Sequence, residues 1–236
     1  MTDTFGRILR DALEGNDSSY IIERDDGFLR HTSGVPLTLP YEEWHEAEKE
    51  AIIGREDPFL DIGCGIARVG DYVKSQGMEY YGIDFSPIAV EICHNRGHNN
   101  VFLMSADNIT FDSPLFKTVV LYGNNFGLVG SPEGVVKMLK QLHEITTEDA
   151  VILAGSRDPE VTDNPMHLDY HAKNRAEGIP PCQVRLRNRY KEEVDDWWYL
   201  YFCGLDTMNG LAKQAGWYLD TAFGGPEYHV GVLKKL

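Results

Sequence analysis

The chain has 236 residues, of which 42% are hydrophobic and 25% are charged, as is usual for a globular protein. This length accommodates one α/β domain, or one such domain with an insertion. The formal net charge of −15 repels nucleic acid phosphates and anionic membrane surfaces, so we expect neither nucleic acid nor a membrane as a partner.

The spacing of the cysteines and the length of the apolar segments indicate whether to expect a metal site and in which compartment to expect the protein. The four cysteines are widely spaced and form no C-x-x-C pair, so we expect no metal site and reduced thiols. The first residues have no apolar core of signal-peptide length, and no window reaches the ~18 apolar residues of a membrane span. A cytoplasmic protein is therefore predicted.

Residues 1–56 are expected to form a helical cap. Apolar residues at helical spacing predict a first helix that ends at Gly15. A turn-rich stretch follows, and residues 41–54 predict a second helix that ends at Gly54.

Short apolar strands alternate with helices from residue 57 onward. This alternation predicts an α/β fold, with a doubly wound, mostly parallel seven-stranded sheet, helices on both faces and a C-terminal antiparallel hairpin. We expect this domain to comprise residues 57–155 and 204–236. The expected strands are 58–62, 79–84, 101–104, 118–122 and 150–155, the helices 67–76, 87–95, 132–145 and 206–215, and the hairpin 217–223 with 228–233.

Residues 156–203 break this alternation. A polar segment leads into residues 183–190, which alternate, and residues 197–203, which are strongly β-prone. We expect an antiparallel hairpin with a helical part, inserted after the fifth strand.

The segment Pro58–Arg68, PFLDIGCGIAR, carries the clearest functional pattern. Gly63 and Gly65 follow an apolar strand and its acidic residue Asp61, and a helix begins just beyond them. Glycine lets the turn adopt positive φ and lets a ligand approach the backbone. The helix N-terminus adds free N–H groups and a partial positive charge. Such a turn binds the polar part of a nucleotide-like cofactor.

Two cofactor classes fit this turn. The dinucleotide fingerprint G-x-G-x-x-G is followed about 20 positions later by an acidic residue, and Asp84 matches that residue. Arg68, however, occupies the position of the third glycine. Asp61 would repel a pyrophosphate, whereas it suits the cationic amino-acid end of S-adenosylmethionine. An acid and an amide, Asp107 and Asn108, follow the third strand, where an adenine amino group would be recognised.

Four motifs in this order resemble the class I S-adenosylmethionine-dependent methyltransferases, which have a Rossmann-like fold. The motifs are LDIGCGIA (60–67), GIDFS (82–86), SADN (105–108) and LYGNNFG (121–127). The resemblance covers somewhat over half of the chain. It departs from the family pattern at Ala67, where a third glycine is common.

The resemblance implies a cofactor site at the ends of the first four strands. The methionine part would lie along the glycine turn, with Asp61 facing its ammonium group. Asp84 would accept hydrogen bonds from both ribose hydroxyls, Phe85 would pack on the adenine, and Asp107 would accept from its amino group. The remaining implied contacts are Gly63, Cys64, Gly65, Ala106 and Asn108, with Tyr122, Gly123 and Asn124 beside the sulfonium.

The acceptor pocket is expected to come from segments outside the sheet core. Residues 156–203 are interpreted as a lid over it. Candidates for the general base or for catalytic contact are Asn124, His167, Tyr170 and His171, and packing is the other interpretation of the last three. Candidates for substrate binding are Tyr41, Trp44, His45, Asn125, Phe126, Arg185 and Arg187. A packing stripe is the other interpretation of Trp44 and its helical neighbours, and a surface paired with nearby acids is that of the arginines.

These patterns predict a methyltransferase that moves a methyl group from S-adenosylmethionine to a small-molecule acceptor by in-line displacement. The alternatives are a nicotinamide-dependent oxidoreductase, a protein that binds S-adenosylmethionine without catalysis, and a protein methyltransferase. The aromatic run at 197–202 is core, pocket wall or the surface of a homodimer.

Overall fold

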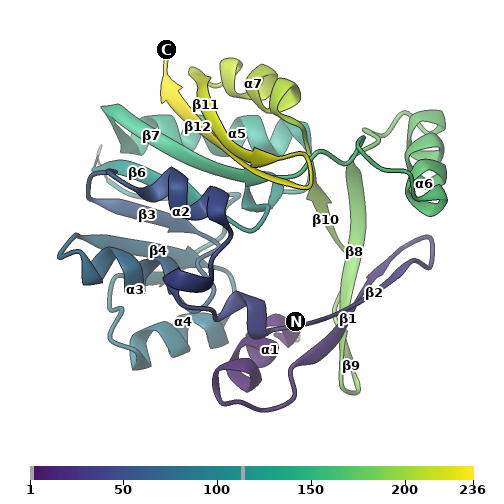
Figure 1. Cartoon of the computed structure of the whole chain (residues 1–236), viewed down its shortest axis with the longest axis horizontal. Coiled ribbons are helices and arrows are strands. Elements are labelled where there is room, and N and C mark those ends of the chain that lie inside the picture. Colours follow the sequence, from purple (N-terminus) through teal and green to yellow (C-terminus); the bar gives the residue numbers. More distant parts are fainter. Residues whose placement is uncertain (1–2, 113–114) are drawn as a thin grey trace.

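The computed structural model describes residues 3–112 and 115–236, and it contains two sheets (Figure 1). The larger sheet has seven strands in the order β11-β12-β7-β6-β3-β4-β5. Its strands are β3 (Phe59–Ile62), β4 (Tyr80–Asp84), β5 (Val101–Leu103), β6 (Phe116–Leu121), β7 (Thr146–Ser156), β11 (Trp217–Gly225) and β12 (Tyr228–Lys235).

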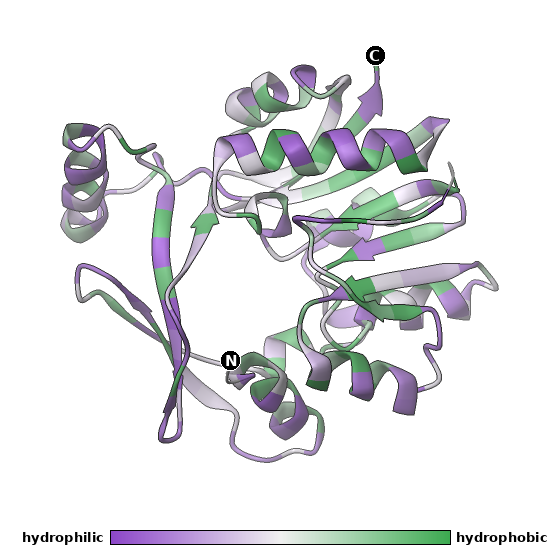
Figure 2. Ribbon diagram, turned by 180° about the vertical axis from the view of Figure 1, so that it is seen from behind, coloured by the Kyte–Doolittle hydropathy of each residue, from purple (hydrophilic) through white to green (hydrophobic). Residues whose placement is uncertain are grey.

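The larger sheet has the predicted topology. β7, β6, β3, β4 and β5 are parallel, whereas β12 runs antiparallel to β7 and pairs with β11 as a hairpin. All four residues of β3 are buried, as expected for a central strand covered on both faces. Figure 2 shows hydrophobic residues concentrated in these strands, while the helices carry hydrophobic and hydrophilic residues side by side.

Helices cover both faces of this sheet, as predicted. One core cluster includes Met138 and Leu142 of α5 with Met208 of α7, and the cluster on the other face includes Ala51 of α2 with Val73 of α3. Leu60 and Phe59 on β3 point into different clusters because side chains alternate along a strand. The helices are α2 (Glu46–Ile52), α3 (Arg68–Ser75), α4 (Pro87–Asn95), α5 (Pro132–Ile145) and α7 (Leu205–Lys213).

The smaller sheet combines a hairpin near the N-terminus with the segment inserted between β7 and β11. Its order is β10-β8-β1-β2, with β9 paired to β8. The hairpin predicted at 183–203 is confirmed, since β8 and β10 pair antiparallel, and helix α6 precedes it. These elements are β1 (Ser19–Arg24), β2 (Leu29–Ser33), β8 (Gln183–Tyr190), β9 (Glu193–Val194), β10 (Trp198–Tyr201) and α6 (Pro165–Ala176).

The N-terminal segment differs from the predicted helical cap. Helix α1 (Thr4–Leu13) forms as expected, but residues 19–33 form the hairpin β1–β2, and β1 pairs with β8. The helix predicted at 41–54 is divided into a 3₁₀ turn, η2 (Tyr41–Glu43), and α2, because Trp44 is extended and His45 caps α2. Two further 3₁₀ turns are η1 (Val35–Leu37) and η3 (Asn125–Gly127).

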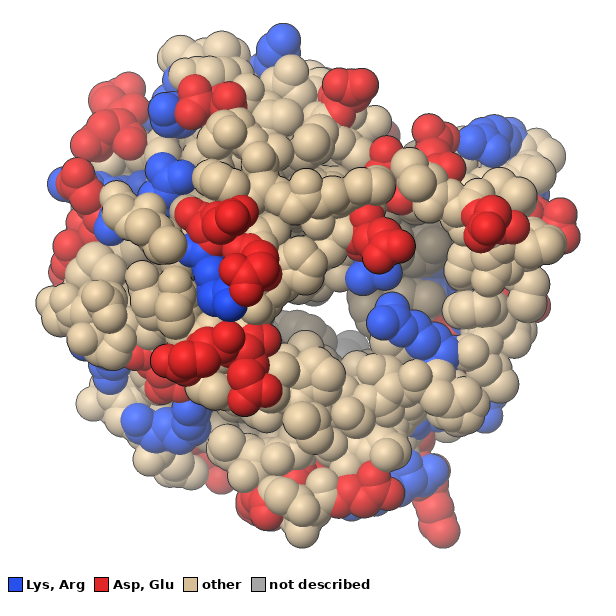
Figure 3. Space-filling model, viewed as in Figure 1, with Lys and Arg blue, Asp and Glu red and all other residues tan. Residues whose placement is uncertain are grey.

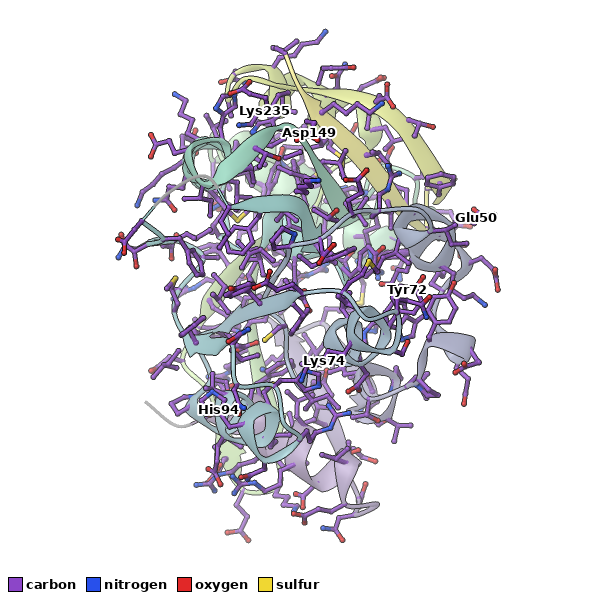
Figure 4. The ribbon with its side chains drawn as sticks, turned by 90° about the vertical axis from the view of Figure 1, so that its left-hand side faces the viewer. Glu50, Tyr72, Lys74, His94, Asp149 and Lys235 are labelled. Carbon is purple, nitrogen blue, oxygen red and sulfur yellow. The ribbon has the colours of Figure 1, made fainter. Side chains whose placement is uncertain are left out.

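An opening lies between the two sheets, at the end of the larger sheet where its parallel strands finish (Figures 1 and 3). Figure 4 shows the opposite end, with Asp149 near the start of β7 and Lys235 at the end of β12. Among the described residues, no helix is both long enough and apolar enough to cross a membrane.

Candidate functional site

The glycine turn follows β3 and has the backbone that the sequence predicts. Gly63 and Gly65 have φ of 69° and 56°, in the left-handed region that favours glycine. A Cβ on Gly63 would lie 2.7 Å from the amide nitrogen of Asn125. That amide donates to the carbonyl oxygens of Ile62 (2.8 Å) and Gly63 (3.1 Å). Asn125 therefore holds the turn in place, and the predicted direct substrate contact is replaced by this supporting role.

Two further residues of the turn use their side chains for packing. Ala67 caps α3 with a left-handed φ of 61°, at the position where the family commonly has glycine. The Cys64 thiol is buried and packs against Gly82 of β4. A hydrogen bond with Cys93, together with burial, holds the pKa of Cys64 well above its usual range. Cys64 therefore offers its backbone, and not a thiolate, to a ligand.

Asp84 ends β4 and faces the glycine turn. One carboxylate oxygen accepts from the Gly65 N–H and the other from the Ser86 N–H, both at 2.9 Å. Only 4% of Asp84 is exposed, and burial raises its pKa to about 6 against these hydrogen bonds. The next residue, Phe85, is 58% exposed, so its ring is available to pack on a base.

Asp61, within β3, lies beneath the same turn. Its carboxylate accepts a hydrogen bond from the Tyr80 hydroxyl at 3.0 Å, and 3% of the residue is exposed. Burial raises its pKa to about 7, and the Tyr80 bond and the charge of Arg68 oppose that shift. A buried carboxyl with a raised pKa gains most from a cationic ligand, which would favour its ionised form.

A buried network that the sequence did not reveal joins α2 to the site. The Glu48 carboxylate pairs with Arg68 at 2.8 Å and accepts from the Tyr228 hydroxyl at 2.7 Å. The Tyr228 hydroxyl in turn accepts from the Gly123 N–H at 3.0 Å. Glu48 thus connects the first turn of α3 to the end of β6. In the sequence Glu48 lies at helical spacing from Tyr41 and Trp44, and that spacing does not distinguish a network from packing.

The segment after β6 presents backbone and one amide. The Tyr122 side chain is buried and donates to the Glu48 carbonyl at 2.8 Å, so only its backbone remains for a cofactor. Gly123 and Asn124 both have left-handed φ, of 67° and 74°. Phe126 is fully buried in the core, which contradicts its predicted role in substrate binding.

The residues after β5 keep their predicted place. Ala106 is buried, whereas Asp107 and Asn108 are exposed. The Asp107 carbonyl accepts from Gln141 at 3.2 Å, and the Asp107 N–H donates to the Ser105 hydroxyl at 3.2 Å. The Asp107 carboxylate is therefore anchored through its backbone and remains accessible.

Helix α1 packs beside the glycine turn, which with Asp61 and Asp84 forms a strand-end cluster, and the sequence did not predict this contact. Leu9 packs with Ile66 and Ala89, next to the glycine turn. The Asp3 carboxylate accepts from the Ser86 hydroxyl at 2.7 Å and from the Ile88 N–H at 3.0 Å, so the start of α1 is joined to the start of α4. Asp3 is far from Ser86 and Ile88 in the sequence, so no local pattern could predict this contact.

The predicted base candidates on α6 lie away from the glycine turn (Figure 1). The Tyr170 hydroxyl donates to Asp25 at 2.8 Å and accepts from the Arg185 N–H at 3.2 Å. The His167 ring bonds to Arg24 at 2.9 Å, and His171 is buried. These contacts fasten α6 to the tip of the β1–β2 hairpin and to β8, so packing replaces the predicted catalytic role.

The alternating arginines of β8 share one face of the smaller sheet, as predicted, but two of them are paired. Arg187 and Arg189 both bond to the Glu23 carboxylate, and this holds the pKa of Glu23 at about 2. Arg185 stacks over Trp197, with its guanidinium carbon 5.4 Å from the ring centre. The other face, with Val184 and Leu186, packs under Tyr170. The ion pair accounts for Arg187 without a substrate.

The aromatic residues before α2 also form a packed group. Tyr41 stacks on Tyr72 at 4.3 Å, and Trp44 is buried with its indole N–H donating to the Leu39 carbonyl at 3.0 Å. His45 accepts the Ala47 N–H as the cap of α2. Tyr41 lines a depression of about 540 Å³ along α3, and none of the residues that line this depression belongs to the strand-end cluster. These contacts indicate packing and replace the predicted substrate contacts.

Comparisons with known proteins agree with this geometry. Residues 59–149 match the family model described as a methyltransferase domain. No curated protein matches the chain. A solved S-adenosylmethionine-dependent methyltransferase from Bacteroides fragilis, in complex with S-adenosyl-L-homocysteine, aligns over 99% of this chain and 94% of its own, with 18% identity and a TM-score of 0.83.

Two other solved structures share the fold. A methyltransferase structure from Methanosarcina mazei aligns over 80% of this chain and 97% of its own, at 14% identity and a TM-score of 0.65. The O-methyltransferase NcsB1 of neocarzinostatin biosynthesis, in complex with S-adenosylmethionine and 2-hydroxy-5-methyl naphthoic acid, aligns over 75% of this chain and 48% of its own, at 14% identity and a TM-score of 0.52.

The chain contains a methyltransferase domain at residues 59–149, and its strand order and glycine turn have the class I arrangement, that of the methyltransferases that use S-adenosylmethionine as methyl donor. The antiparallel β12 and the Arg68 side chain both depart from the dinucleotide-binding pattern, in which the strands are parallel and a third glycine is present. The oxidoreductase alternative is therefore wrong.

Proposed function

We propose that this methyltransferase acts on a small-molecule acceptor held in the opening between the two sheets. The observation that carries the proposal is the strand-end cluster. Asp61 and Gly65 lie at the carboxyl end of β3 and Asp84 at that of the adjacent β4, where Asp84 is bonded to the glycine turn at 2.9 Å. NcsB1, whose structure contains a naphthoic acid, supports an acceptor of this size class.

Each group of the cluster has a definite task in this proposal. The bound donor supplies an activated methyl group, so the protein must orient the reactants and exclude water. Asp61 would balance the charge of an ammonium group, and Asp84 would accept from ribose hydroxyls through its remaining lone pairs. Phe85 would cover the adenine, and Asp107 would accept from its amino group. The backbone of Gly123 and Asn124 would border the transferring methyl.

The smaller sheet completes the acceptor side. Residues 156–203 supply β8 and β10, and residues 19–33 supply β1 and β2, so the acceptor lid is built from both segments. This arrangement extends the proposed lid beyond the insertion. The acceptor thus meets a wall that shares no strand with the cofactor-binding sheet.

Calorimetric titration tests the cofactor part of the proposal. We expect binding of S-adenosylmethionine and S-adenosyl-L-homocysteine and none of NAD. Absence of heat with both sulfur compounds on folded protein would contradict it. Formation of S-adenosyl-L-homocysteine is then measured against small hydroxyl, amine and thiol acceptors, with peptides in parallel. Turnover confined to peptides would exclude the small-molecule acceptor, and binding without any turnover would favour a non-catalytic protein.

A further inference from the structure

Arg157 occupies a position at the border of the two halves. It follows the last residue of β7, and β7 lies beside β6 in the sheet. The Arg157 Nε donates to the Asn124 side-chain oxygen at 3.2 Å, just beyond the end of β6. Its guanidinium carbon lies 5.5 Å from the ring centre of Phe202. The side chain therefore lies where the transferring methyl is expected, against an aromatic surface.

Arg157 lacks the counterion that most arginines of this chain have. Within the described residues, no carboxylate lies within 4.0 Å of its guanidinium, although the chain has 37 acidic and 22 basic residues. Arg68 and Arg187, by contrast, pair with Glu48 and Glu23. A partly buried guanidinium without a carboxylate partner is a ready site for an anion.

A second cation lies near it. Arg30 on β2 is exposed and also forms no ion pair among the described side chains. Burial lowers the pKa of Arg157, and the charge of Arg30 lowers it further, while Tyr228 and Glu227 act in the opposite direction. Figure 3 shows basic side chains gathered on the rim of the opening, on the side of the smaller sheet. Two like charges held near each other gain most when an anion binds between them.

The surface next to Arg157 is apolar. Phe202 packs with both the main core and the cluster of the smaller sheet, where Trp198 and Leu200 are partly buried. This surface suits the hydrophobic part of a ligand whose charged end meets the guanidinium.

We propose that the methyl acceptor is an organic anion, a carboxylate or a phosphate ester on an apolar body, and that Arg157, assisted by Arg30, anchors the charged group beside Asn124. The inference rests on the proposed function. In the transfer, the acceptor's lone pair forms the bond to the methyl carbon, the carbon–sulfur bond breaks with its electrons on sulfur, and a proton on the nucleophile leaves to water. Arg157 takes no part in that exchange and fixes the distance between the reactants.

The test uses benzoate and phenyl phosphate as probes and neutral benzamide as the control ligand. Binding is followed by saturation-transfer NMR with the protein saturated by S-adenosyl-L-homocysteine. We expect one or both anions to bind at least about tenfold more tightly than benzamide, since a charge-assisted pair is involved. The stronger of the two anions identifies the charged group.

Variants assign the preference to one residue. In Arg157→Gln, the ratio of the affinity for the anion to the affinity for benzamide is expected to fall about tenfold. Arg157→Lys should keep part of this ratio. Arg185→Gln is the matched control, because Arg185 also forms no ion pair in the described structure but stacks on Trp197. Equal binding of benzamide and both anions, or a loss in Arg185→Gln instead of Arg157→Gln, would overturn the proposal.

The outcome separates this inference from the proposed function. Binding of S-adenosyl-L-homocysteine to wild type and to Arg157→Gln is measured by calorimetry in the same preparations. If it binds to both and no anion preference exists, the anionic acceptor is wrong and the methyltransferase assignment stands. If it binds to neither, the proposed function itself fails.

Discussion

The two halves of the molecule differ in how their parts are joined. The cofactor half is built from consecutive strand–turn–helix units, and Asp84 meets Gly65 across 19 residues of chain. The half with the smaller sheet, which is the proposed acceptor side, depends on β1 pairing with β8, in which Glu23 lies 164 residues from Arg187. The first half is therefore specified by patterns that are local in the sequence. The second is an assembly of distant segments whose side chains mostly bond to one another.

The largest effect is expected at Asp84. Asp84→Asn replaces one acceptor oxygen by a donor, which then opposes the N–H of Gly65 or Ser86. We expect the affinity for S-adenosyl-L-homocysteine to fall about 100-fold, since hydrogen bonds to charged groups are worth roughly 1.5–3 kcal/mol each. Calorimetry measures it. Asp149→Asn, at an exposed position near the start of β7 and at the opposite end of the sheet, is the matched control and should keep the wild-type affinity.

The variant Glu48→Gln tests whether the network of Glu48, Arg68 and Tyr228 stabilises the folded protein. Glu48→Gln leaves Arg68 without its partner and weakens the bond from Tyr228. We expect the free energy of unfolding to fall by about 2–3 kcal/mol, below the full penalty for breaking a fully buried pair because Arg68 keeps some exposure. Urea unfolding measures it. Glu46→Gln, on the exposed side of α2, should stay within about 0.5 kcal/mol of wild type.

The pH dependence of cofactor binding sharpens the comparison. The pKa of Asp61 is raised to about 7 and that of Asp84 to about 6, and the ammonium group and the ribose hydroxyls of the ligand favour the ionised forms of these two carboxyls. Affinity for S-adenosyl-L-homocysteine should therefore rise between pH 5.5 and 8, by about tenfold or more, with proton release at the lower pH. Calorimetry in buffers of different ionisation enthalpy counts the protons. Asp61→Asn should flatten the profile, and a flat wild-type profile would contradict it.

The same shifts predict the opposite trend for the stability of the free protein. Both folded pKa values lie above the unfolded value, so the folded state holds more protons than the unfolded state between about pH 4 and 7. These two groups therefore make the free protein less stable as the pH rises through that window. Added ligand should reverse their contribution, which thermal unfolding with and without S-adenosyl-L-homocysteine measures.

The smallest effect is expected on α6. Tyr170→Phe removes the hydroxyl that joins Asp25 to the Arg185 N–H. The expected cost is about 1–2 kcal/mol of unfolding free energy, with S-adenosyl-L-homocysteine affinity unchanged within about twofold. Urea unfolding and calorimetry on the same variant test both statements. A large loss of affinity would show that the two halves are not independent, and that Tyr170 belongs to the site after all.

The sequence by itself determined the larger sheet and the cofactor turn. Hydrophobic periodicity and turn chemistry depend on neighbouring residues, so the glycines at 63 and 65 and the strand-end acids at 61 and 84 were visible without a structure. Their places were predicted correctly because parallel strands bring their carboxyl ends to one edge.

The tertiary structure alone decided the smaller sheet, which is the proposed acceptor side. Nothing local to residues 19–33 shows that they pair with β8, since a strand's partner is set by distant hydrogen bonds and burial. The same holds for side chains: Tyr170, Phe126 and Arg187 have types that suit a site, but packing and ion pairs engage them elsewhere. Arg157 is the opposite case, since the sequence did not single it out. Its lack of a carboxylate partner depends on which residues surround it in the folded chain, and the order of residues does not show that.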